Sequence, residues 1–265
     1  RIENLLSRLS AGIELLFTSK RKAGQYWNSL LRDAMRGNLT NQWRKPYQFA
    51  EVKDSDARPK WLPDSWDWST LGEYITLNYG KGLTKKNRID GPIPVYGSNG
   101  IIGYHSEYLV KDRSIIVGRK GSVGEVHRTS GSFWPIDTTY YATLSQALDF
   151  NFAYYLLLYL RLESLDKSTA IPGLNRNDVY ALSIPLPPIE EQQCISKILE
   201  AHFNVVGNLV QHLNLVHKLS ENLRYKVLHS AFSGKLVPQS DDDEPVGELL
   251  KRIQKDTKSK QTRLI

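Results

Sequence analysis

Apolar residues recur at alternating steps of four and three along the first part of the chain. The positions on this stripe are Ile2, Leu6, Leu9, Ile13, Leu16, Lys20, Ala23, Trp27, Leu30 and Ala34. Nine of these ten residues are apolar, and a stripe with this spacing is typical of a coiled-coil helix. Gly37 follows the stripe and is a residue that commonly ends a helix. The pattern predicts a long spacer helix, which we place at residues 1–45.

A second stripe with the same spacing lies far downstream. Its positions are Ile195, Leu199, His202, Val206, Leu209, Leu213, Val216, Ser220, Leu223 and Val227. Pro187 and Pro188 stand where a helix can begin, and Gly234 stands where it can end. We therefore predict a second long helix at residues 189–237. Each stripe covers more than thirty residues, which corresponds to about 50 Å of helix.

The two stripes can bury each other if the helices pack antiparallel, because such a helix is not stable alone in water. The alternative, in which each helix packs separately on a globular core, stays open at this point. The ends of the two helices also resemble each other. The matching residues, all at an offset of 197, are Leu31, Ala34, Gly37, Leu39 and Gln42 with Leu228, Ala231, Gly234, Leu236 and Gln239. This internal repeat is what a parent protein built of two tandem halves would produce.

The sequence between the helices has a different character. After a polar linker at 46–65, residues 66–188 are rich in Gly, Tyr and short β-branched runs separated by turn residues. The runs predicted as strands are Ile93–Tyr96, Ile101–Tyr104, Ser114–Val117 and Tyr140–Leu144. One helix is predicted near Phe152–Leu165, and Tyr104, Tyr140 and Tyr141 are expected in the core. The fold class is therefore α+β, one strand-rich α/β domain flanked by two long helices in an antiparallel coiled coil. The tail at 238–265 is expected to be partly disordered with a short helical stretch.

The composition is that of a soluble protein, and its charge is unevenly distributed. The net charge is +7, with nine Lys/Arg against three Asp/Glu in residues 1–45 and nine against four in residues 80–130. Such local positive charge favours nucleic acid as a partner, although a merely basic surface is the alternative. Cys194 is the single cysteine, no signal peptide opens the chain, and the run Phe152–Leu162 is too short to cross a membrane. We expect a cytoplasmic protein with no membrane partner. Because residue 1 is Arg, we expect the native start to lie upstream.

Motifs for catalysis or metal binding are missing from the sequence. The glycines of GRKGSVG, Gly118–Gly124, lie between predicted strands and lack a P-loop or dinucleotide pattern, so a tight turn is the better interpretation. Pro63-Asp64 follows Glu51-Val52-Lys53, the reverse of the order in restriction nucleases. Pro187-Pro188 lacks the Asn or Asp before it and the aromatic residue after it that adenine methyltransferases use. The six histidines show no metal-ligand spacing. We therefore expect no catalytic residue and no metal site in this chain.

Seven stretches are informative when taken together; they are, in order, LPDSWDWSTLGEYI, YGSNGIIGYHSEYL, SIIVGRKGSVGEV, FWPIDTTYY, IPGLNRNDV, IPLPPIEEQQCISKIL and AFSGKLVPQ. The first six resemble the landmarks of the target-recognition domain in specificity subunits of type I restriction-modification systems, and the last resembles the distal end of the helix that follows it. The stretch from Ile184 to Leu199 is the most specific, since it marks the passage from recognition domain to spacer helix. Such a subunit has two recognition domains, whereas this chain has one with a helix before and after it. The resemblance thus implies a C-terminal half or a single-domain version.

The resemblance also implies a division of labour. The domain would read one half of a bipartite sequence in double-stranded DNA, while the helices set the spacing to a second reader and dock methyltransferase (modification) subunits. A motor-nuclease (restriction) subunit would cut. No cofactor is expected in this chain; S-adenosylmethionine, ATP and Mg are expected on the partner subunits. A self-dimer that rebuilds a two-domain reader is left open. The alternative from another class is a non-catalytic coiled-coil protein-interaction scaffold.

Candidate DNA-binding residues lie in the polar and basic loops of the domain. The candidates for phosphate contact are Lys81, Lys85, Lys86, Arg88, Arg119, Lys120 and Arg128. Those that can present donors and acceptors to base edges are Ser98, Asn99, Thr138, Thr139, Asn175 and Arg176. For each of them a solvated surface position is the alternative, and Asn99 and Asn175 could serve as turn residues.

Overall fold

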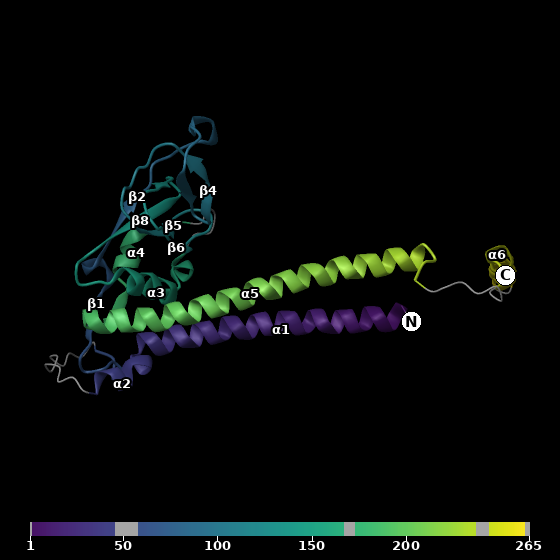
Figure 1. The fold of residues 1–265 in the computed structure, drawn as a ribbon, viewed down its shortest axis with the longest axis horizontal. Coiled ribbons are helices and arrows are strands. Elements are labelled where there is room, and N and C mark those ends of the chain that lie inside the picture. The colour runs from purple at the N-terminus through teal and green to yellow at the C-terminus, as the bar shows by residue number, and fades with distance from the viewer. Residues whose placement is uncertain (1, 46–57, 167–172, 237–243, 263–265) are drawn as a thin grey trace. The chain divides into compact units, whose positions relative to one another are not determined.

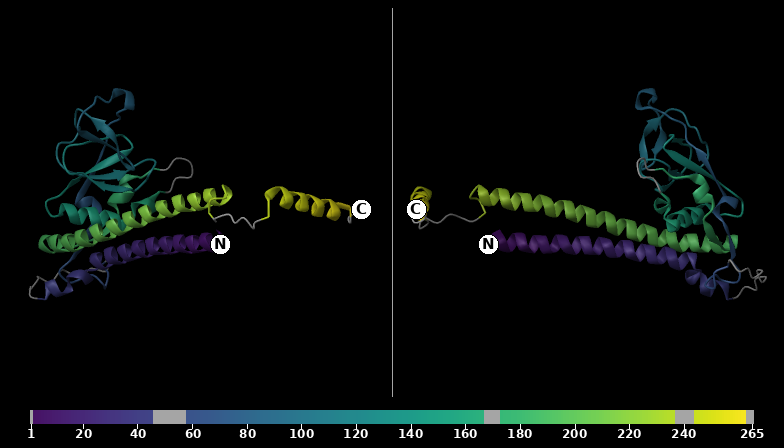
Figure 2. Two further views of the ribbon diagram at one scale, coloured as in Figure 1. Left: turned by 45° about the vertical axis from the view of Figure 1, so that its right-hand side comes forward. Right: turned by 180° about the vertical axis from the view of Figure 1, so that it is seen from behind.

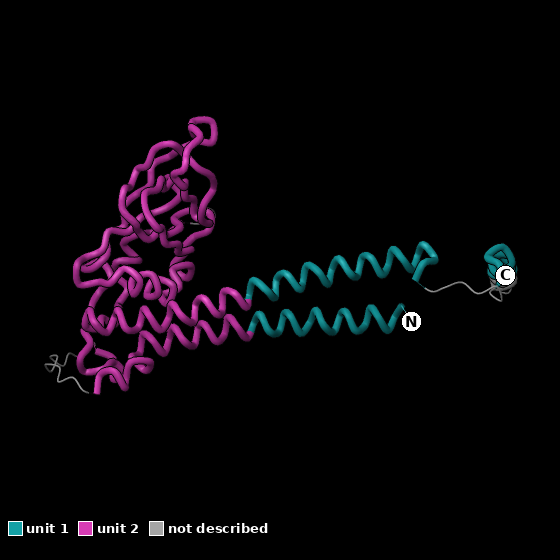
Figure 3. Tube along the Cα trace, viewed as in Figure 1, with its two compact units in different colours: residues 1–21, 210–265 teal, residues 22–209 magenta. Residues whose placement is uncertain are grey.

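The computed structural model describes residues 2–45, 58–166, 173–236 and 244–262. The chain divides into two compact units, residues 1–21 with 210–265 and residues 22–209 (Figure 3). Two long helices, α1 (Ile2–Met35) and α5 (Ile189–Phe232), contribute to both units. None of the helices in the described ranges is long and apolar enough to cross a membrane.

Helices α1 and α5 pack against each other in an antiparallel manner within each unit. In the first unit the Phe17 and His217 rings lie 5.0 Å apart, and the Lys20 amino group donates a hydrogen bond to Asn214 at 3.0 Å. In the second unit the Trp27 and Phe203 rings are 5.3 Å apart. Figure 2 shows the two helices side by side. The predicted pairing of the helices is confirmed.

The apolar stripe was predicted correctly for α1 but only in part for α5. In α1, Ala23, Leu30 and Ala34 are buried. In α5, Ile195 and Leu199 are buried, but Leu209, Val216 and Leu223 are 45–52% exposed, so these three positions were predicted wrongly. The inward positions in that part of α5 are Val210, Leu213, His217 and Ser220. Adjacent apolar pairs such as Leu209-Val210 allow two stripes one residue apart, and periodicity alone cannot choose between them.

Glycine ends both long helices, as predicted. Gly37 follows α1 with φ +73° and Gly234 follows α5 with φ +69°, a conformation that glycine adopts without steric cost. The first helix is shorter than predicted, since it ends at Met35 and is followed by the separate turn of α2 (Asn41–Arg44). Helix α5 begins directly after Pro188.

In the described residues between the two helices, 58–166 and 173–188, there are nine short strands. They are β1 (Asp67–Thr70), β2 (Ile75–Tyr79), β3 (Ile93–Gly97), β4 (Gly100–His105), β5 (Ile115–Gly118), β6 (Val126–Arg128), β7 (Trp134–Pro135), β8 (Thr139–Leu144) and β9 (Ser183–Leu186). The four strands named from the sequence correspond to β3, β4, β5 and β8. The glycine-rich stretch between β5 and β6 is a turn, and Gly121 and Gly124 have positive φ angles of 79° and 76°.

The strands form three small sheets, in the orders β2-β8-β5-β6, β4-β3-β7 and β1-β9. In the largest sheet β8 pairs antiparallel with both β2 and β5. Strand β1 pairs antiparallel with β9, with Asp67 opposite Leu186. Because β1 opens the strand-rich domain and β9 closes it, the two ends of this domain lie side by side where α5 begins (Figure 1).

The described ranges also contain the helices α3 (Phe150–Leu160), α4 (Arg176–Tyr180) and α6 (Val246–Thr262). Helix α3, predicted near Phe152–Leu165, lies between the sheets and the long helices (Figures 1 and 2), where Tyr155 packs against Trp27 and Phe203. The same core cluster joins buried residues of α1, the strands, α3 and α5. Tyr140 is buried as predicted, whereas Tyr104 is 56% exposed on β4 and its prediction was wrong.

Candidate nucleic-acid interface

The pairing of β8 with β2 and β5 brings three loops to one edge of the four-stranded sheet. Tyr79 at the end of β2 is opposite Tyr140, and Gly118 at the end of β5 is opposite Thr139. The segments that follow β2 and β5 and the one that precedes β8 therefore leave the sheet together. These segments carry four of the candidate DNA-binding residues: Lys81, Arg119, Lys120 and Thr138.

Backbone hydrogen bonds hold these loops to one another. The N–H groups of Arg119 and Lys120 both donate to the carbonyl of Thr138, at 2.9 and 3.1 Å. The N–H of Lys81 donates to the carbonyl of Pro135 at 2.9 Å. These hydrogen bonds fix the backbone of the loops. The exposed side chains of Lys81 and Lys120 therefore extend from fixed backbone positions.

The segment before α4 joins the same edge from a distant part of the sequence. Lys120 forms an antiparallel bridge with Gly173, and the N–H of Leu174 donates to the carbonyl of Arg119 at 2.9 Å. Asn175 and Arg176 follow at once. The Asn175 side chain caps α4 by accepting a hydrogen bond from the N–H of Asn177 at 2.9 Å, so its predicted role as a turn residue is the one that the structure shows.

Tyr79 lies at the centre of this surface and was missed from the sequence. Its ring is 51% exposed, and the guanidinium carbons of Arg119 and Arg176 lie 5.2 and 5.1 Å from its centroid. These are cation–π distances. The ring also packs on Tyr140 at 5.1 Å. Side chains alternate between the two faces of a strand, so Tyr79 is expected to face inward like the buried Ile75 and Leu77. The one sequence signal against this expectation was that Tyr79 directly precedes Gly80 and Lys81, where the strand ends.

Ser98 and Asn99 lie in the turn of the β3–β4 hairpin. The Ser98 hydroxyl accepts a hydrogen bond from the N–H of Ser122 at 3.4 Å, which places this turn against the β5–β6 loop. Asn99 is exposed. The structure therefore brings Ser98 and its neighbour next to the loop that carries Arg119 and Lys120.

The second basic segment comprises Lys85, Lys86 and Arg88. Lys85 and Lys86 are exposed on a single 3-10 turn, Lys85–Asn87. Arg88 is half-buried and donates from Nη1 to the carbonyl of Ile102 at 2.8 Å. Arg88 thus ties the segment to β4, and the two lysines are the side chains that remain open to a ligand.

Two of the predicted residues make their contacts within the fold: Arg128 is half-buried, and Thr139 is buried, which corrects the interpretation of Thr139 as a DNA contact. Arg128 lies in β6, where both terminal nitrogens donate to Glu200 at 2.7 Å and the guanidinium lies 4.8 Å from the Tyr154 ring. Thr139 is fully buried, and its hydroxyl donates to the carbonyl of Ile136 at 2.8 Å. The terminal nitrogens of Arg128 and the hydroxyl of Thr139 thus have acceptors within the fold.

The ion pair of Arg128 with Glu200 predicts a pH dependence of stability. The hydrogen bond from Arg128, and then that from the Tyr155 hydroxyl, lowers the pKa of Glu200 from its ordinary value of 4.5. A carboxyl group with a lowered folded pKa stabilises the fold above its unfolded pKa, and this contribution is lost as the pH falls through the folded pKa. We expect Glu200→Gln to flatten the loss of stability below about pH 4.5, measured by urea unfolding at several pH values. Glu190→Gln, at an exposed position of the same helix, should keep the wild-type profile.

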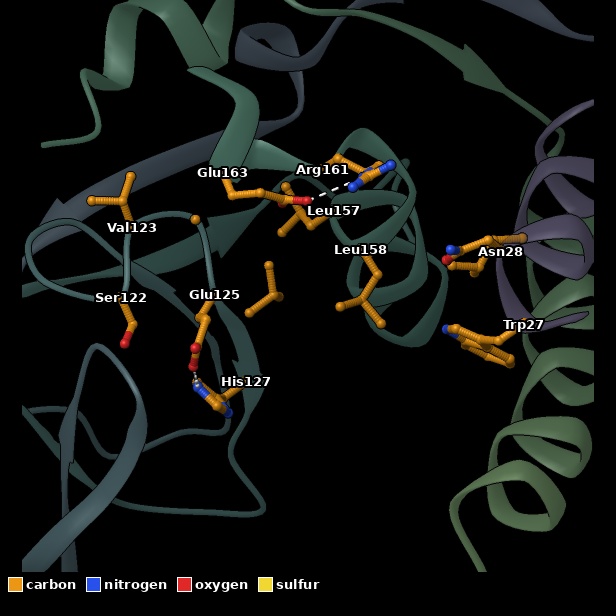
Figure 4. Close-up of a pocket in the computed structure, with 13 residues that line it drawn as sticks. Trp27, Asn28, Ser122, Val123, Glu125, His127, Leu157, Leu158, Arg161 and Glu163 are labelled. Atoms are coloured by element: carbon orange, nitrogen blue, oxygen red, sulfur yellow. Dashed lines mark hydrogen bonds and ion pairs between the residues drawn. The ribbon is translucent and has the colours of Figure 1, made fainter. Parts of the chain in front are cut away.

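A pocket of about 580 Å³ lies elsewhere in the same unit, between α1, the β5–β6 loop and the end of α3 (Figure 4). Trp27 and Asn28 line it from α1, and an ion pair joins Arg161 to Glu163 at 3.1 Å on its other side. Glu125 also lines it. The carboxylates of Glu125 and Glu163 disfavour phosphate in this pocket.

Among residues 2–45, 58–166, 173–236 and 244–262, no group of three side chains with metal-ligating atoms gathers at one place. We call the surface formed by Lys81, Arg119, Lys120 and Arg176 around Tyr79 the basic edge. It presents arginine and lysine groups, with amide and hydroxyl groups beside them, around an aromatic ring. Such a set binds phosphates and base edges by hydrogen bonding and charge.

Residues 63–216 match the family model described as type I restriction modification DNA specificity domain. Among curated proteins, the EcoprrI specificity subunit of a type I restriction enzyme from Escherichia coli is 27% identical over 153 residues, 56% of this chain and 38% of that protein. The MjaVIII specificity subunit from Methanocaldococcus jannaschii is 23% identical over 208 residues, 71% of this chain and 49% of that protein. This chain thus spans about half or less of the length of these relatives.

Solved structures show the same fold. The HsdS subunit from Thermoanaerobacter tengcongensis matches with a TM-score of 0.55 and 19% identity, over 89% of this chain and 57% of that one. The S subunit of a type I restriction-modification system from M. genitalium matches with a TM-score of 0.57 and 18% identity, over 90% and 60%.

Proposed function

The chain belongs to the family of type I restriction-modification DNA specificity domains, whose model matches more than half of it, and from this membership we propose that it reads one half of a bipartite target in double-stranded DNA. The observation that carries the proposal is the convergence of Lys81, Arg119, Lys120 and Arg176 on one edge of the recognition domain. These residues come from three segments that are distant in sequence. A surface assembled in this way concentrates positive charge where a phosphate backbone can lie.

Within the proposed complex the domain and the helices have different tasks. The loops at the basic edge contact DNA, while α1 and α5 set the distance to a second reader and dock methyltransferase subunits. The chain itself is proposed to be non-catalytic. S-adenosylmethionine, ATP and Mg would act on the methyltransferase and motor-nuclease subunits. The names of the curated relatives, specificity subunits of restriction enzymes, support this assignment.

The direct test is a gel-shift titration of a mixed-sequence duplex library, followed by sequencing of the bound fraction. The full chain is tested alone and together with the methyltransferase subunit of its own system. We expect enrichment of one short sequence. If neither sample enriches any sequence, the proposal fails, and binding to the methyltransferase without any effect on DNA would instead indicate a protein-interaction scaffold.

Charge reversal at the second basic segment is expected to weaken binding to every duplex. Each phosphate contact contributes about −0.9 to the slope of log affinity against log salt, so Lys85→Glu with Lys86→Glu should flatten that slope by about 2 if both lysines contact phosphates. Fluorescence anisotropy at four salt concentrations measures it. The matched control is Lys218→Glu with Lys226→Glu, which makes the same change of charge at exposed positions of α5. An unchanged slope in the first variant would remove these lysines from the interface.

A further inference from the structure

Arg119 is held in place far more firmly than the lysines around it. Its backbone N–H donates to Thr138, and its carbonyl accepts from Leu174. Its side-chain Nε donates to the carbonyl of Asp137 at 3.1 Å, while the guanidinium carbon lies 5.2 Å from the Tyr79 ring and 6.0 Å from the Tyr140 ring. The guanidinium plane is therefore restrained by an aromatic surface and by a hydrogen bond at its inner nitrogen.

This arrangement leaves a particular set of donors for a ligand. With Nε bonded to Asp137, the remaining donors of Arg119 are the two terminal amino groups. No residue in the described parts of the chain accepts a hydrogen bond from them, and none forms a salt bridge with Arg119. These two amino groups can therefore donate parallel hydrogen bonds to a ligand that has two adjacent acceptors.

A second cation beside the same ring favours the same kind of ligand. Arg176 lies 5.1 Å from the same Tyr79 centroid, so the two guanidinium groups share one aromatic platform. Two positive charges beside one ring favour a ligand that is rich in hydrogen-bond acceptors. Guanine presents two adjacent acceptors in the major groove, O6 and N7, and an arginine fork matches them with two parallel hydrogen bonds.

Phosphate is the competing acceptor for any arginine. The exposed Lys81 and Lys120 stand on the same edge and can neutralise phosphates without a fixed orientation. A bidentate contact to a base, in contrast, needs a guanidinium whose plane is already set, because immobilising a free side chain on binding costs affinity. The restrained residue suits a base, and the free lysines suit the backbone.

We propose that Arg119, oriented by Tyr79 and the Asp137 carbonyl, reads a guanine of the DNA target through its two terminal amino groups. Tyr79 is a positioning residue that acts through Arg119. This inference rests on the proposed function, and it replaces the expectation from the sequence that Arg119 contacts phosphate.

The test selects binding sequences from a duplex library with a randomised central segment, using the full chain. The wild type should enrich a site that contains a guanine at which 7-deazaguanine, which lacks the N7 acceptor, weakens binding. Arg119→Lys keeps the charge but lacks the fork, so it should lose about five- to hundredfold of the preference for that guanine while the salt slope stays unchanged. For this variant 7-deazaguanine at the same position should cause no further loss.

Two further comparisons separate orientation from a merely structural effect. Tyr79→Phe keeps the aromatic face and should retain the guanine preference, whereas Tyr79→Leu should reduce it. Arg113→Lys is the matched control, because Arg113 also stacks on a ring, 4.4 Å from Phe150, and it should select the wild-type site.

The outcomes distinguish the inference from the function on which it rests. If Arg119→Lys enriches the same guanine as the wild type, the guanine assignment is overturned while the proposed function stands. If Arg119→Ala weakens all duplexes equally and flattens the salt slope, Arg119 contacts phosphate and the assignment is likewise overturned. If the wild type selects no sequence, either alone or together with the methyltransferase subunit of its system, both fail.

Discussion

Replacing Glu191 by alanine is expected to lower the free energy of unfolding by about 3–5 kcal/mol, the range measured when one partner of a buried ion pair is removed. Glu191 lies in the first turn of α5 and is fully buried. It forms a salt bridge with Arg44 and accepts hydrogen bonds from the Thr40 hydroxyl at 2.5 Å and from the Trp66 indole N–H at 2.9 Å. The substitution would leave all three donors without this acceptor.

The expected loss is large because Glu191 and its partners come from three different parts of the fold. Thr40 and Arg44 belong to the segment after α1, and Trp66 precedes the first strand of the recognition domain. Arg44 also donates to the carbonyl of Gly37 at 2.6 Å, where α1 has just ended. The single carboxylate therefore connects the end of α1, the start of α5 and the entrance of the domain. A buried charge without its partner cannot recover its solvation.

Urea unfolding followed by tryptophan fluorescence measures the effect, since Trp66 takes part in the network. Glu190→Ala is the matched control: Glu190 is the preceding residue in the same helical turn but is exposed, and its substitution should change stability by no more than about 0.5 kcal/mol. If the two variants unfold at the same urea concentration, the network does not join the helices to the domain.

The parts of the fold that the sequence predicts are those set by local rules. Gly37 and Gly234 end the helices because the left-handed conformation at these positions suits glycine, and Pro188 precedes α5. The strands β3, β4, β5 and β8 follow from β-branched runs between turns. The register of α5 past Gly207 could not be predicted, since the choice between Leu209 and Val210 depends on contacts with α1, which lies almost two hundred residues away.

The residues of the candidate site could likewise be predicted only in part. Polar and basic loops identify Lys81, Lys120 and Arg176 as surface residues, and the fold brings them together. The sequence could not show that Arg128 faces Glu200, because that ion pair joins β6 to α5 across 72 positions. Nor could it show that Tyr79 at the end of β2 supports two arginines that lie 40 and 97 positions further along the chain. Tertiary contacts of this kind have no local pattern.

Gly124→Ala is expected to cost about 2–5 kcal/mol of stability, because two penalties act at one residue. Gly124 has a φ of +76°, which an alanine adopts only with strain. A Cβ atom at this position would also lie 2.2 Å from the backbone nitrogen of Glu163, in the turn that follows α3. Backbone cannot rotate out of the way as a side chain can, so the loop or the turn must shift.

Gly121→Ala provides the control within the same loop. Gly121 has a similar φ of +79°, but the nearest atom to its added Cβ would be the Ser98 hydroxyl oxygen at 3.2 Å, which can move. Only the conformational penalty then remains, about 1–2 kcal/mol. Thermal and urea unfolding of both variants separate the two penalties, and equal losses would contradict the close packing of Gly124 on Glu163. The N–H of Gly124 donates to the carbonyl of Gly118 at 2.8 Å, and Gly118 directly precedes Arg119. A shift of the loop at Gly124 therefore reaches Arg119. At a temperature where both variants are folded, the Gly124 variant should bind DNA more weakly than the Gly121 variant.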